Sequence, residues 1–365
     1  MFKFFSKSYK FLIREKNGLL YNLRLKHIIS RNSDLLSEGE YALLTCGKTI
    51  VYLKNEETTD FISKHYKNLS KNYRKGIVPW FDLFFKFRVA NSQNKKQGEN
   101  FSGQLIMMTL NGDTKIFDFE TCRVLTKHQD EEKFCQIKLA FDVFNPTFDH
   151  TILYFSKNNY LIEELIGKKE NQRCYDQLTD FEKNDVFQDL MLKYTEYFNQ
   201  LDSKSIQYLT VKDICEKLKD EVDEKIYARI ERILLIPSFE SVLHPRVFLH
   251  GDLHFGNILI DDKRAKLIDF ERSGNYVFIY DFFNFICEET VLLVEKNYLF
   301  LKEYYNGSYD DLLLNMFAQF EMIYSIDKKI EYLMLFLSER ILKRGFNRKE
   351  HAFLNEIERL YSKRK

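Results

Sequence analysis

One short acidic motif constrains this 365-residue chain more than any other feature. Asp252 precedes Asn257 by five residues, and a second acid, Asp269, follows an apolar run further along. Gly251 and Gly256 allow a tight loop there, because glycine adopts backbone conformations that other residues avoid. A carboxylate can orient a hydroxyl and accept its proton, and Mg²⁺ prefers carboxylate and amide oxygens. The motif therefore predicts an active site with Asp252 as base and with Asn257 and Asp269 as metal ligands.

Each of these residues, taken singly, has a commoner structural explanation. Aspartate and asparagine often stabilise turns or cap helices. The joint occurrence of His250, both glycines, the acid, the amide and the later run Ile268–Glu271 makes that explanation improbable. His254 is less informative, because a loop histidine packs against its neighbours at least as often as it contacts a phosphate or substrate.

The motif resembles the family of small-molecule kinases that contains aminoglycoside phosphotransferases and choline kinases. The run from His250 to Asn257, HGDLHFGN, is similar to the catalytic loop of aminoglycoside phosphotransferases. The later runs resemble the choline kinase sequence; they are Ile268–Glu271, Asn275-Tyr276 and Tyr280–Phe285 followed by Glu288. The resemblance is specific over 250–290, weaker over 105–170 and absent over 1–100.

The resemblance implies a two-lobed, protein-kinase-like α+β fold. A five-stranded antiparallel N-terminal lobe would precede a mainly helical C-terminal lobe. It implies ATP- and Mg²⁺-dependent transfer of a phosphoryl group to an alcohol group of a non-protein substrate. Asp252 and His250 would be the catalytic residues, Asn257 would contact nucleotide and metal, and Asp269 would bind the metal.

The expected order of elements agrees with this fold. Apolar runs predict strands at 105–110, 114–119 and 123–127, and Asn111-Gly112 predicts a hairpin turn between the first two. Asp130 is placed to cap a helix that ends at Pro146. Two further strands are expected at 151–155 and 160–166. Helical periodicity follows, with helices at 180–201 and 211–236 and from 280 onward.

Nucleotide contacts in the N-terminal lobe follow from the resemblance. Lys127 ends the third strand and would be the nucleotide-binding lysine, with Lys115 as its rival. Its acidic partner is left open between Glu132 and Asp142. The segment 162–167 resembles the hinge, whose backbone would meet adenine; its central residues are Glu163, Glu164 and Leu165. No G-x-G-x-x-G motif precedes Lys127, so the phosphate contacts of this lobe are undefined.

The domain boundaries come from composition. The polar segment 91–103 is a candidate linker, so we expect a basic extension at 1–100, the first lobe at 101–168 and the second at 169–365. Residues 1–100 hold 19 basic and 9 acidic side chains, a balance of +10 beside −9 for the remainder. Basic and aromatic residues alternate in residues 1–33, which predicts contact with an anionic membrane surface. A solvated helix face is the competing explanation.

Three acceptors fit the predicted chemistry. Choline would need an aromatic cage, for which Tyr276, Tyr280, Phe282, Phe283 and Phe285 are available. An aminoglycoside would need acids, such as Glu288-Glu289. A sugar of a surface glycan or glycolipid would suit the basic segment. The alternative to an enzyme is a catalytically weak or inactive kinase-like binding protein. No motif indicates a nucleic-acid partner.

The compartment is inferred from absences in the sequence. The six cysteines form no C-x-x-C pair and indicate buried thiols in a reducing compartment. No run of about 18 apolar residues is present, and lysines interrupt the apolar N-terminus, which is therefore unlike a signal peptide. We expect a cytoplasmic protein, with the basic segment as its membrane contact.

Overall fold

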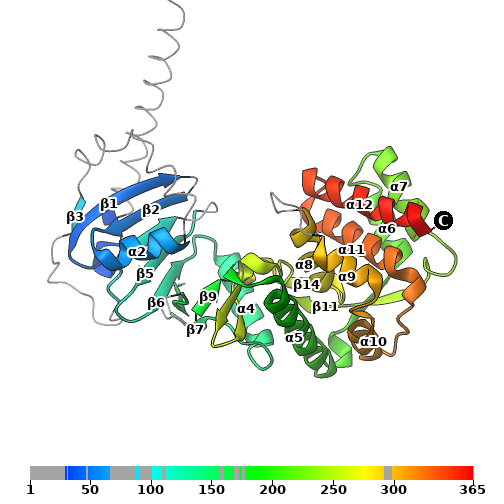
Figure 1. The fold of residues 1–365 in the computed structure, drawn as a ribbon, viewed down its shortest axis with the longest axis horizontal. Coiled ribbons are helices and arrows are strands. Elements are labelled where there is room, and N and C mark those ends of the chain that lie inside the picture. Colours follow the sequence, from blue (N-terminus) through cyan, green and yellow to red (C-terminus); the bar gives the residue numbers. More distant parts are fainter. Residues whose placement is uncertain are drawn as a thin grey trace, which may run out of the picture. The chain divides into compact units, whose positions relative to one another are not determined.

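The structure, a computed structural model, consists of two compact units, which are described one at a time (Figure 1). The first comprises Met1–Gln129 and Ile152–Lys168, and the second comprises Asp130–Thr151 and Lys169–Lys365. The residues that the structure describes are 29–30, 32–46, 48–65, 87–89, 101–108, 112–156, 160–167, 172–174, 177–291 and 298–364.

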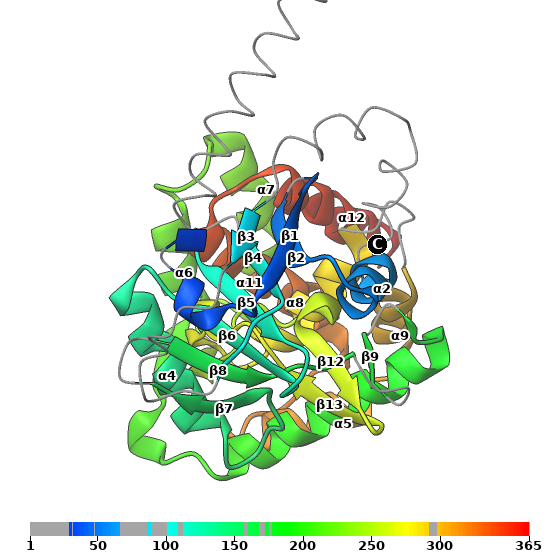
Figure 2. The same ribbon diagram turned by 90° about the vertical axis from the view of Figure 1, so that its left-hand side faces the viewer.

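The first unit is built on one antiparallel sheet of eight strands, in the order β3-β1-β2-β4-β5-β6-β8-β7 (Figure 2). A short helical turn η1 (Ser33–Leu35) precedes the sheet, and helix α2 (Glu56–His65) follows β2. The strands are β1 (Gly39–Cys46), β2 (Lys48–Leu53), β3 (Phe87–Val89), β4 (Leu105–Met108), β5 (Thr114–Asp118), β6 (Arg123–Lys127), β7 (Ile152–Phe155) and β8 (Tyr160–Glu164).

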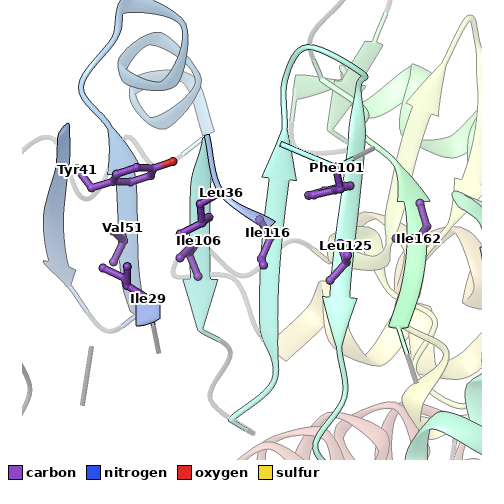
Figure 3. Packing of buried hydrophobic residues seen from close by; sticks show 9 residues of the cluster. All are labelled: Ile29, Leu36, Tyr41, Val51, Phe101, Ile106, Ile116, Leu125 and Ile162. Carbon is purple, nitrogen blue, oxygen red and sulfur yellow. The ribbon is translucent and has the colours of Figure 1, made fainter. Parts of the chain in front are cut away.

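A continuous row of aliphatic side chains crosses five strands on one face of this sheet. Each member is the register partner of the next, and all are at most 1% exposed; they are Val51, Ile106, Ile116, Leu125 and Ile162. Ile29, Leu36, Tyr41 and Phe101 complete the cluster (Figure 3). Because side chains alternate between the faces of a strand, this row fixes the register of the whole sheet.

The opposite face packs against α2. Phe61 and Ile62 of this helix lie against a second buried cluster. Its members are Ile50, Leu105, Met107, Phe117, Phe119, Val124 and Leu165. Asn55 fixes the start of the helix, since its side-chain oxygen accepts the backbone N–H of Thr58 at 2.9 Å. The sheet therefore has a buried apolar layer on both faces.

Two expectations about this unit are wrong. The sheet has eight strands instead of five. The boundary near residue 100 is also wrong, because β2 pairs with β4 from Thr49↔Met108 to Tyr52↔Leu105. The strands before residue 100 thus share one sheet and one core with the predicted lobe. The predicted strands at 105–110, 114–119, 123–127, 151–155 and 160–166 are confirmed, with small changes at their ends.

The second unit is mainly helical, with two small three-stranded sheets, β10-β11-β14 and β13-β12-β9. The strands are β9 (Gln172–Cys174), β10 (Gln207–Thr210), β11 (Leu243–Leu249), β12 (Ile258–Asp261), β13 (Arg264–Leu267) and β14 (Gly274–Val277). The helices are α4 (Glu131–Phe144), α5 (Asp180–Asn199), α6 (Val211–Leu218), α7 (Glu224–Leu234), α8 (Tyr280–Val291), α9 (Leu299–Asn306), α10 (Asp310–Ala318), α11 (Lys329–Arg344) and α12 (Arg348–Arg364).

Local sequence explains where these helices begin and end. The side chain of Asp130 accepts the backbone N–H groups of Glu132 and Lys133, as its predicted capping role requires. The predicted boundary at residue 168 coincides with the change from the first unit to the second at Lys169, but helix α4, within Asp130–Thr151, also belongs to the second unit instead of the predicted first lobe. The helix expected over 211–236 is two helices, because Asp223 caps a new one at α7.

The structure bears on the membrane-span and cysteine expectations. No helix in the described ranges is long and apolar enough to cross a lipid bilayer. Cys215 and Cys287 are buried as expected, but Cys135 is exposed. Most of the basic segment 1–33 lies outside the described residues, so its membrane contact stays a prediction.

Candidate active site

The 250–257 loop connects β11 to β12 and carries the central residues of the motif. It ends in a short turn, η4 (Phe255–Asn257). The Asn257 side-chain nitrogen donates to the Asp252 carbonyl at 3.0 Å, and its backbone N–H donates to the His254 carbonyl at 2.9 Å. With its Nδ2 used in this way, the amide oxygen of Asn257 accepts no hydrogen bond from the described residues.

Asn257 and Asp269 lie at the same end of the β12–β13 hairpin. Ile258 pairs with Leu267, and the Ile268 N–H donates to the Asn257 carbonyl at 3.1 Å. Asp269 is exposed and has φ +63° and ψ +61°, a conformation that costs a non-glycine residue about 1–3 kcal/mol. Its carboxylate has no hydrogen bond or ion pair within the described part of the chain. Asn257 and Asp269 thus lie near each other along the backbone, and each has a side-chain oxygen without a partner among the described residues.

The carboxylate of Asp252 lies between two guanidinium groups. Nη2 of Arg344, the last residue of α11, lies 2.8 Å from its Oδ1, and Nε of Arg272 lies 3.5 Å from its Oδ2. Burial acts to raise the pKa of Asp252, but the charges of Arg344 and His254 outweigh it, so the pKa lies below its ordinary value. Asp252 is therefore a charged acceptor near neutral pH.

His250 connects the loop to the segment before Asp269. Its side chain is fully buried, and its Nε2 lies 2.9 Å from the Ile268 carbonyl. Its Nδ1 accepts the Asp252 N–H at 3.3 Å, which assigns the proton to Nε2. Because both ring nitrogens bind backbone groups, His250 positions the loop, and the expectation that it is catalytic is not supported by its placement.

The N-terminal part of the loop is held by a buried acid on α8. Asp281 accepts the backbone N–H groups of His250 at 2.8 Å and Gly251 at 2.9 Å, and the Tyr194 hydroxyl at 2.6 Å. Burial raises the pKa of Asp281, and these hydrogen bonds, with the nearby His250, act in the opposite direction. The backbone before Asp252 is therefore fixed by three donors on one carboxylate.

A second contact from α8 holds the loop one residue after Asp252. The Asn284 side-chain nitrogen donates to the Leu253 carbonyl at 2.8 Å. Arg340 of α11 donates to the Asn284 side-chain oxygen and to the carboxylate of Glu288, and lies 2.8 Å from Glu350. Arg340 is 1% exposed, so a fully buried guanidinium fixes which way the Asn284 amide points.

Gly251 is required by both conformation and space. Its φ is +73°, a region that residues with a Cβ rarely adopt. A Cβ here would lie 2.3 Å from the Arg272 carbonyl oxygen and 2.6 Å from the Tyr276 hydroxyl. The close approach of these two backbone segments is what places Arg272 beside Asp252.

Helix α4 also contacts the segment after Asp269. Lys133 forms a 2.6 Å ion pair with Glu271, and the Gln136 side chain donates to the Ser273 carbonyl. Ser273 in turn donates its hydroxyl to the His250 carbonyl at 3.3 Å. The two candidate acids of α4, Glu132 and Asp142, thus belong to the same unit as the loop.

The predicted nucleotide residues of the N-terminal lobe lie in the first unit. Lys127 ends β6, and its Nζ lies 5.7 Å from the ring centre of Tyr160 on β8. Glu163 is buried and accepts the Thr126 hydroxyl at 3.3 Å. The N–H of Leu165 donates to the Cys122 carbonyl at 2.9 Å, so this expected hinge donor is already used. Glu164 ends β8.

Sequence analysis did not find the residues that hold the loop. Asp281 lay within the resembling run, but it carried no assigned role. Arg340 and Arg344 lie about 90 residues beyond the loop on a helix whose arginines look like ordinary surface residues in sequence. Only the packing of α11 against α8 brings them to the site, so no local signal could have identified them.

The family comparison matches this region of the chain. Residues 193–297 match the model of the phosphotransferase enzyme family, a segment that contains the 250–257 loop, Asp269 and Asp281. No curated protein sequence matches the chain.

The chain is also similar, at low sequence identity, to three solved structures. A glucosamine kinase in complex with glucosamine, ADP and inorganic phosphate has a TM-score of 0.43 and 12% identity, over 70% of this chain and 81% of its own. The choline kinase LicA from Streptococcus pneumoniae has a TM-score of 0.40 and 13% identity, over 72% and 91%. A thermostable mutant of aminoglycoside phosphotransferase APH(4)-Ia, with ADP and hygromycin B, has a TM-score of 0.41 and 13% identity, over 72% and 90%.

Proposed function

We propose that the protein is a phosphotransferase that uses ATP and Mg²⁺ to phosphorylate an alcohol group of a non-protein acceptor. The family match over 193–297 supports the class of reaction. The observation that supports the proposal is a charged, partly exposed Asp252 on the same loop as Asn257, whose side-chain oxygen, like the carboxylate of Asp269 on the next hairpin strand, has no partner among the described residues. These are the groups that phosphoryl transfer needs near the acceptor and near the metal.

In this proposal Asp252 orients the acceptor hydroxyl and takes its proton. A carboxylate has about four lone-pair positions, so the contacts with Arg344 and Arg272 leave room for a hydroxyl donor. Asn257 Oδ1 and the Asp269 carboxylate would hold Mg²⁺, which when bound neutralises charge on the phosphates. Asp281 and Asn284 keep the loop backbone fixed while the proton moves.

Two of the three expected acceptors, choline and an aminoglycoside, were considered because of specific side chains. The aromatic residues considered for a choline cage are core residues, each at most 6% exposed. Glu288 is 2% exposed and paired with Arg340, so it is not a free acid for an aminoglycoside. Glu289 is 1% exposed. The side chains that were expected to bind choline or an aminoglycoside are therefore buried and not available to either acceptor.

The decisive experiment compares wild-type protein with Asp252→Asn. The amide cannot accept the proton, so acceptor-independent hydrolysis of Mg·ATP and transfer to an acceptor should both fall by about 10²–10⁴-fold. Nucleotide affinity should change little, because Asp252 is not a proposed metal ligand. A variant that keeps most of the wild-type turnover would contradict the proposal. Wild-type protein that binds Mg·ATP without turnover would favour the alternative, a binding protein.

The membrane contact of residues 1–33 and a cytoplasmic location remain proposals that rest on charge alone. Co-sedimentation with anionic and neutral vesicles at low and high salt tests the contact, because salt screens docking by lysine and arginine. Equal binding to both vesicle types would contradict it.

A further inference from the structure

Two basic side chains of the second unit contact Asp252, and two more contact Glu288 or Tyr276; we call the four the basic rim: Arg272, Arg344, Lys349 and Lys343. Arg272 and Arg344 contact the carboxylate of Asp252 directly. Lys349 lies 3.5 Å from Glu288, to which Arg344 also extends at 3.7 Å. The carboxylates of these ion pairs are Asp252 and Glu288, and the charge of Glu339 acts on Lys343.

Arg272 is the member of the rim that is free to bind a ligand. Its side chain is 54% exposed, and Nε lies 3.5 Å from Asp252. Its two terminal nitrogens have no partner in the part of the chain that the structure describes. A guanidinium fork with free N–H groups matches a carboxylate or phosphate, which it can bind through two parallel hydrogen bonds.

Arg344 has a different place in the rim. Its side chain is only 12% exposed, and Nη2 donates to both the Asp252 carboxylate and the Gly251 carbonyl. It is therefore fixed next to the reacting position instead of reaching into solvent. An acceptor hydroxyl that approaches Asp252 must lie close to this buried positive charge.

Lys343 extends the positive surface. It is exposed, and its Nζ lies 5.1 Å from the ring centre of Tyr276. The Tyr276 hydroxyl donates to the Arg272 carbonyl at 2.6 Å, so Lys343 and Arg272 are held on neighbouring parts of the same surface. Burial lowers the pKa of Lys343, an effect to which the charge of Arg246 adds.

We propose that the acceptor is an anionic polyol, one that carries a carboxylate or phosphate close to the hydroxyl that is phosphorylated. Arg272 would bind that anionic group while the hydroxyl meets Asp252. A cationic acceptor would instead bring like charges together at Arg272 and Arg344. This inference rests on the proposed phosphotransferase function and names the class of its acceptor.

The transfer step is balanced with ATP as the donor. The acceptor hydroxyl gives its proton to a carboxylate oxygen of Asp252, and its oxygen forms a bond to the γ-phosphorus. The bond between that phosphorus and the bridging oxygen to the β-phosphate breaks. ADP leaves with the electron pair of that bond.

The test uses sugars that share a ring but differ in charge. The full chain, saturated with Mg·ADP, is titrated with glucuronate, glucose 6-phosphate, glucose and glucosamine in a calorimeter. At least one of the two anionic probes should bind about tenfold or more tightly than glucosamine, since hydrogen bonds to charged groups are the stronger ones. Comparing the two distinguishes a carboxylate from a phosphate. Equal affinities, tighter glucosamine binding or no binding of either anionic probe would overturn the proposal.

Variants identify the group responsible. The Arg272→Gln variant should bind the preferred anionic probe roughly tenfold more weakly, while its affinity for glucose should not change. The Arg272→Glu variant should bind glucosamine more tightly than it binds the anionic probes. Arg359→Gln is the matched control, because Arg359 is 50% exposed and its ion pair in the described part of the chain is with Glu356 on its own helix. An Arg272→Gln variant that loses Mg·ADP affinity but keeps its preference among the sugars would assign Arg272 to the nucleotide and overturn the proposal.

The two proposals fail in different ways. Asp252-dependent hydrolysis of Mg·ATP reports on the phosphotransferase function without any acceptor. If that hydrolysis is present and the charge preference is absent, only the anionic acceptor is wrong. If the hydrolysis is absent as well, the phosphotransferase function itself is wrong.

Discussion

Asp281 and Asn284 lie one turn apart on α8 and hold the backbone on both sides of Asp252. Asp281 accepts the N–H groups of His250 and Gly251, and Asn284 donates to the Leu253 carbonyl at 2.8 Å. The side chain of Asp252 is thus aimed by a helix that does not contain it. Rigid support of this kind is what a residue needs if it is to meet a hydroxyl at hydrogen-bond distance.

Arg340→Met should destabilise the protein strongly. The substitution leaves Glu288 and Glu350 buried without their main cation, and breaking a buried ion pair costs about 3–5 kcal/mol. Urea unfolding measures the loss. Arg359→Met is the control, because its exposed pair should contribute less than about 1 kcal/mol. If both variants lose the same small amount, the buried network does not stabilise the fold.

Gly251→Ala should impair folding or activity far more than Gly345→Ala. Both glycines have positive φ, +73° and +76°, so both substitutions strain the backbone, and Gly345, with ψ +166°, lies in a region that is essentially restricted to glycine. Only at Gly251 would the new Cβ meet the Arg272 carbonyl, at 2.3 Å; at Gly345 nothing lies within 4 Å. Thermal unfolding and ATP hydrolysis of the two variants distinguish a steric clash with the Arg272 carbonyl from backbone strain alone. Equal effects of the two substitutions would argue against a clash at residue 251.

Asp269→Ala should abolish the Mg²⁺ dependence of nucleotide binding, and Asn257→Ala should weaken it, because each removes an oxygen ligand. The control is Asp262→Ala, which removes a carboxylate at the opposite end of the same β12–β13 hairpin. ATP is titrated with and without Mg²⁺. Asp269→Ala protein that binds Mg·ATP as the wild type does would show that this carboxylate is structural.

His244→Phe should make the protein more resistant to acid. His244 is fully buried on β11, neither ring nitrogen has a partner among the described residues, and burial lowers its pKa to about 4. Between pH 6.5 and 4 the unfolded chain binds a proton that the folded protein excludes, so folded stability falls as the pH falls. The full shift corresponds to about 3 kcal/mol.

The measurement for His244 is urea unfolding at pH 7 and pH 4.5. The phenylalanine variant should lose less stability between these pH values than the wild type loses. His351→Phe replaces an exposed histidine and should leave the pH dependence unchanged. A His244→Phe variant with the pH dependence of the wild type would show that this histidine does not titrate with unfolding.

The sequence predicted what is local and missed what depends on distant packing. Asp252, Asn257 and Asp269 could be assigned because the hairpin that unites them spans few residues. Arg344 could not be assigned, because it lies far along the chain from the loop. Only the packing of α11 against α8 brings it there, and the sequence does not reveal that packing. The boundary at 91–103 failed for a related reason. Polar composition identifies a loop, but it does not show whether the strands before and after that loop pair with each other. That depends on which side chains lie opposite each other across the two strands, as Val51 and Ile106 do.

The eight-stranded sheet has a consequence for anyone who shortens the chain to its family-like part. A protein that begins at residue 101 would lack β1, β2 and β3, and β4 would become an edge strand. The N–H and C=O groups of β4 that face β2 would then be unpaired, and Ile106 and Leu105 would lose the apolar neighbours that β1, β2 and α2 supply. Such an exposed, flat edge promotes self-association between chains. The first hundred residues therefore also cover the edge of β4, which would otherwise be open to pairing with other copies of the chain.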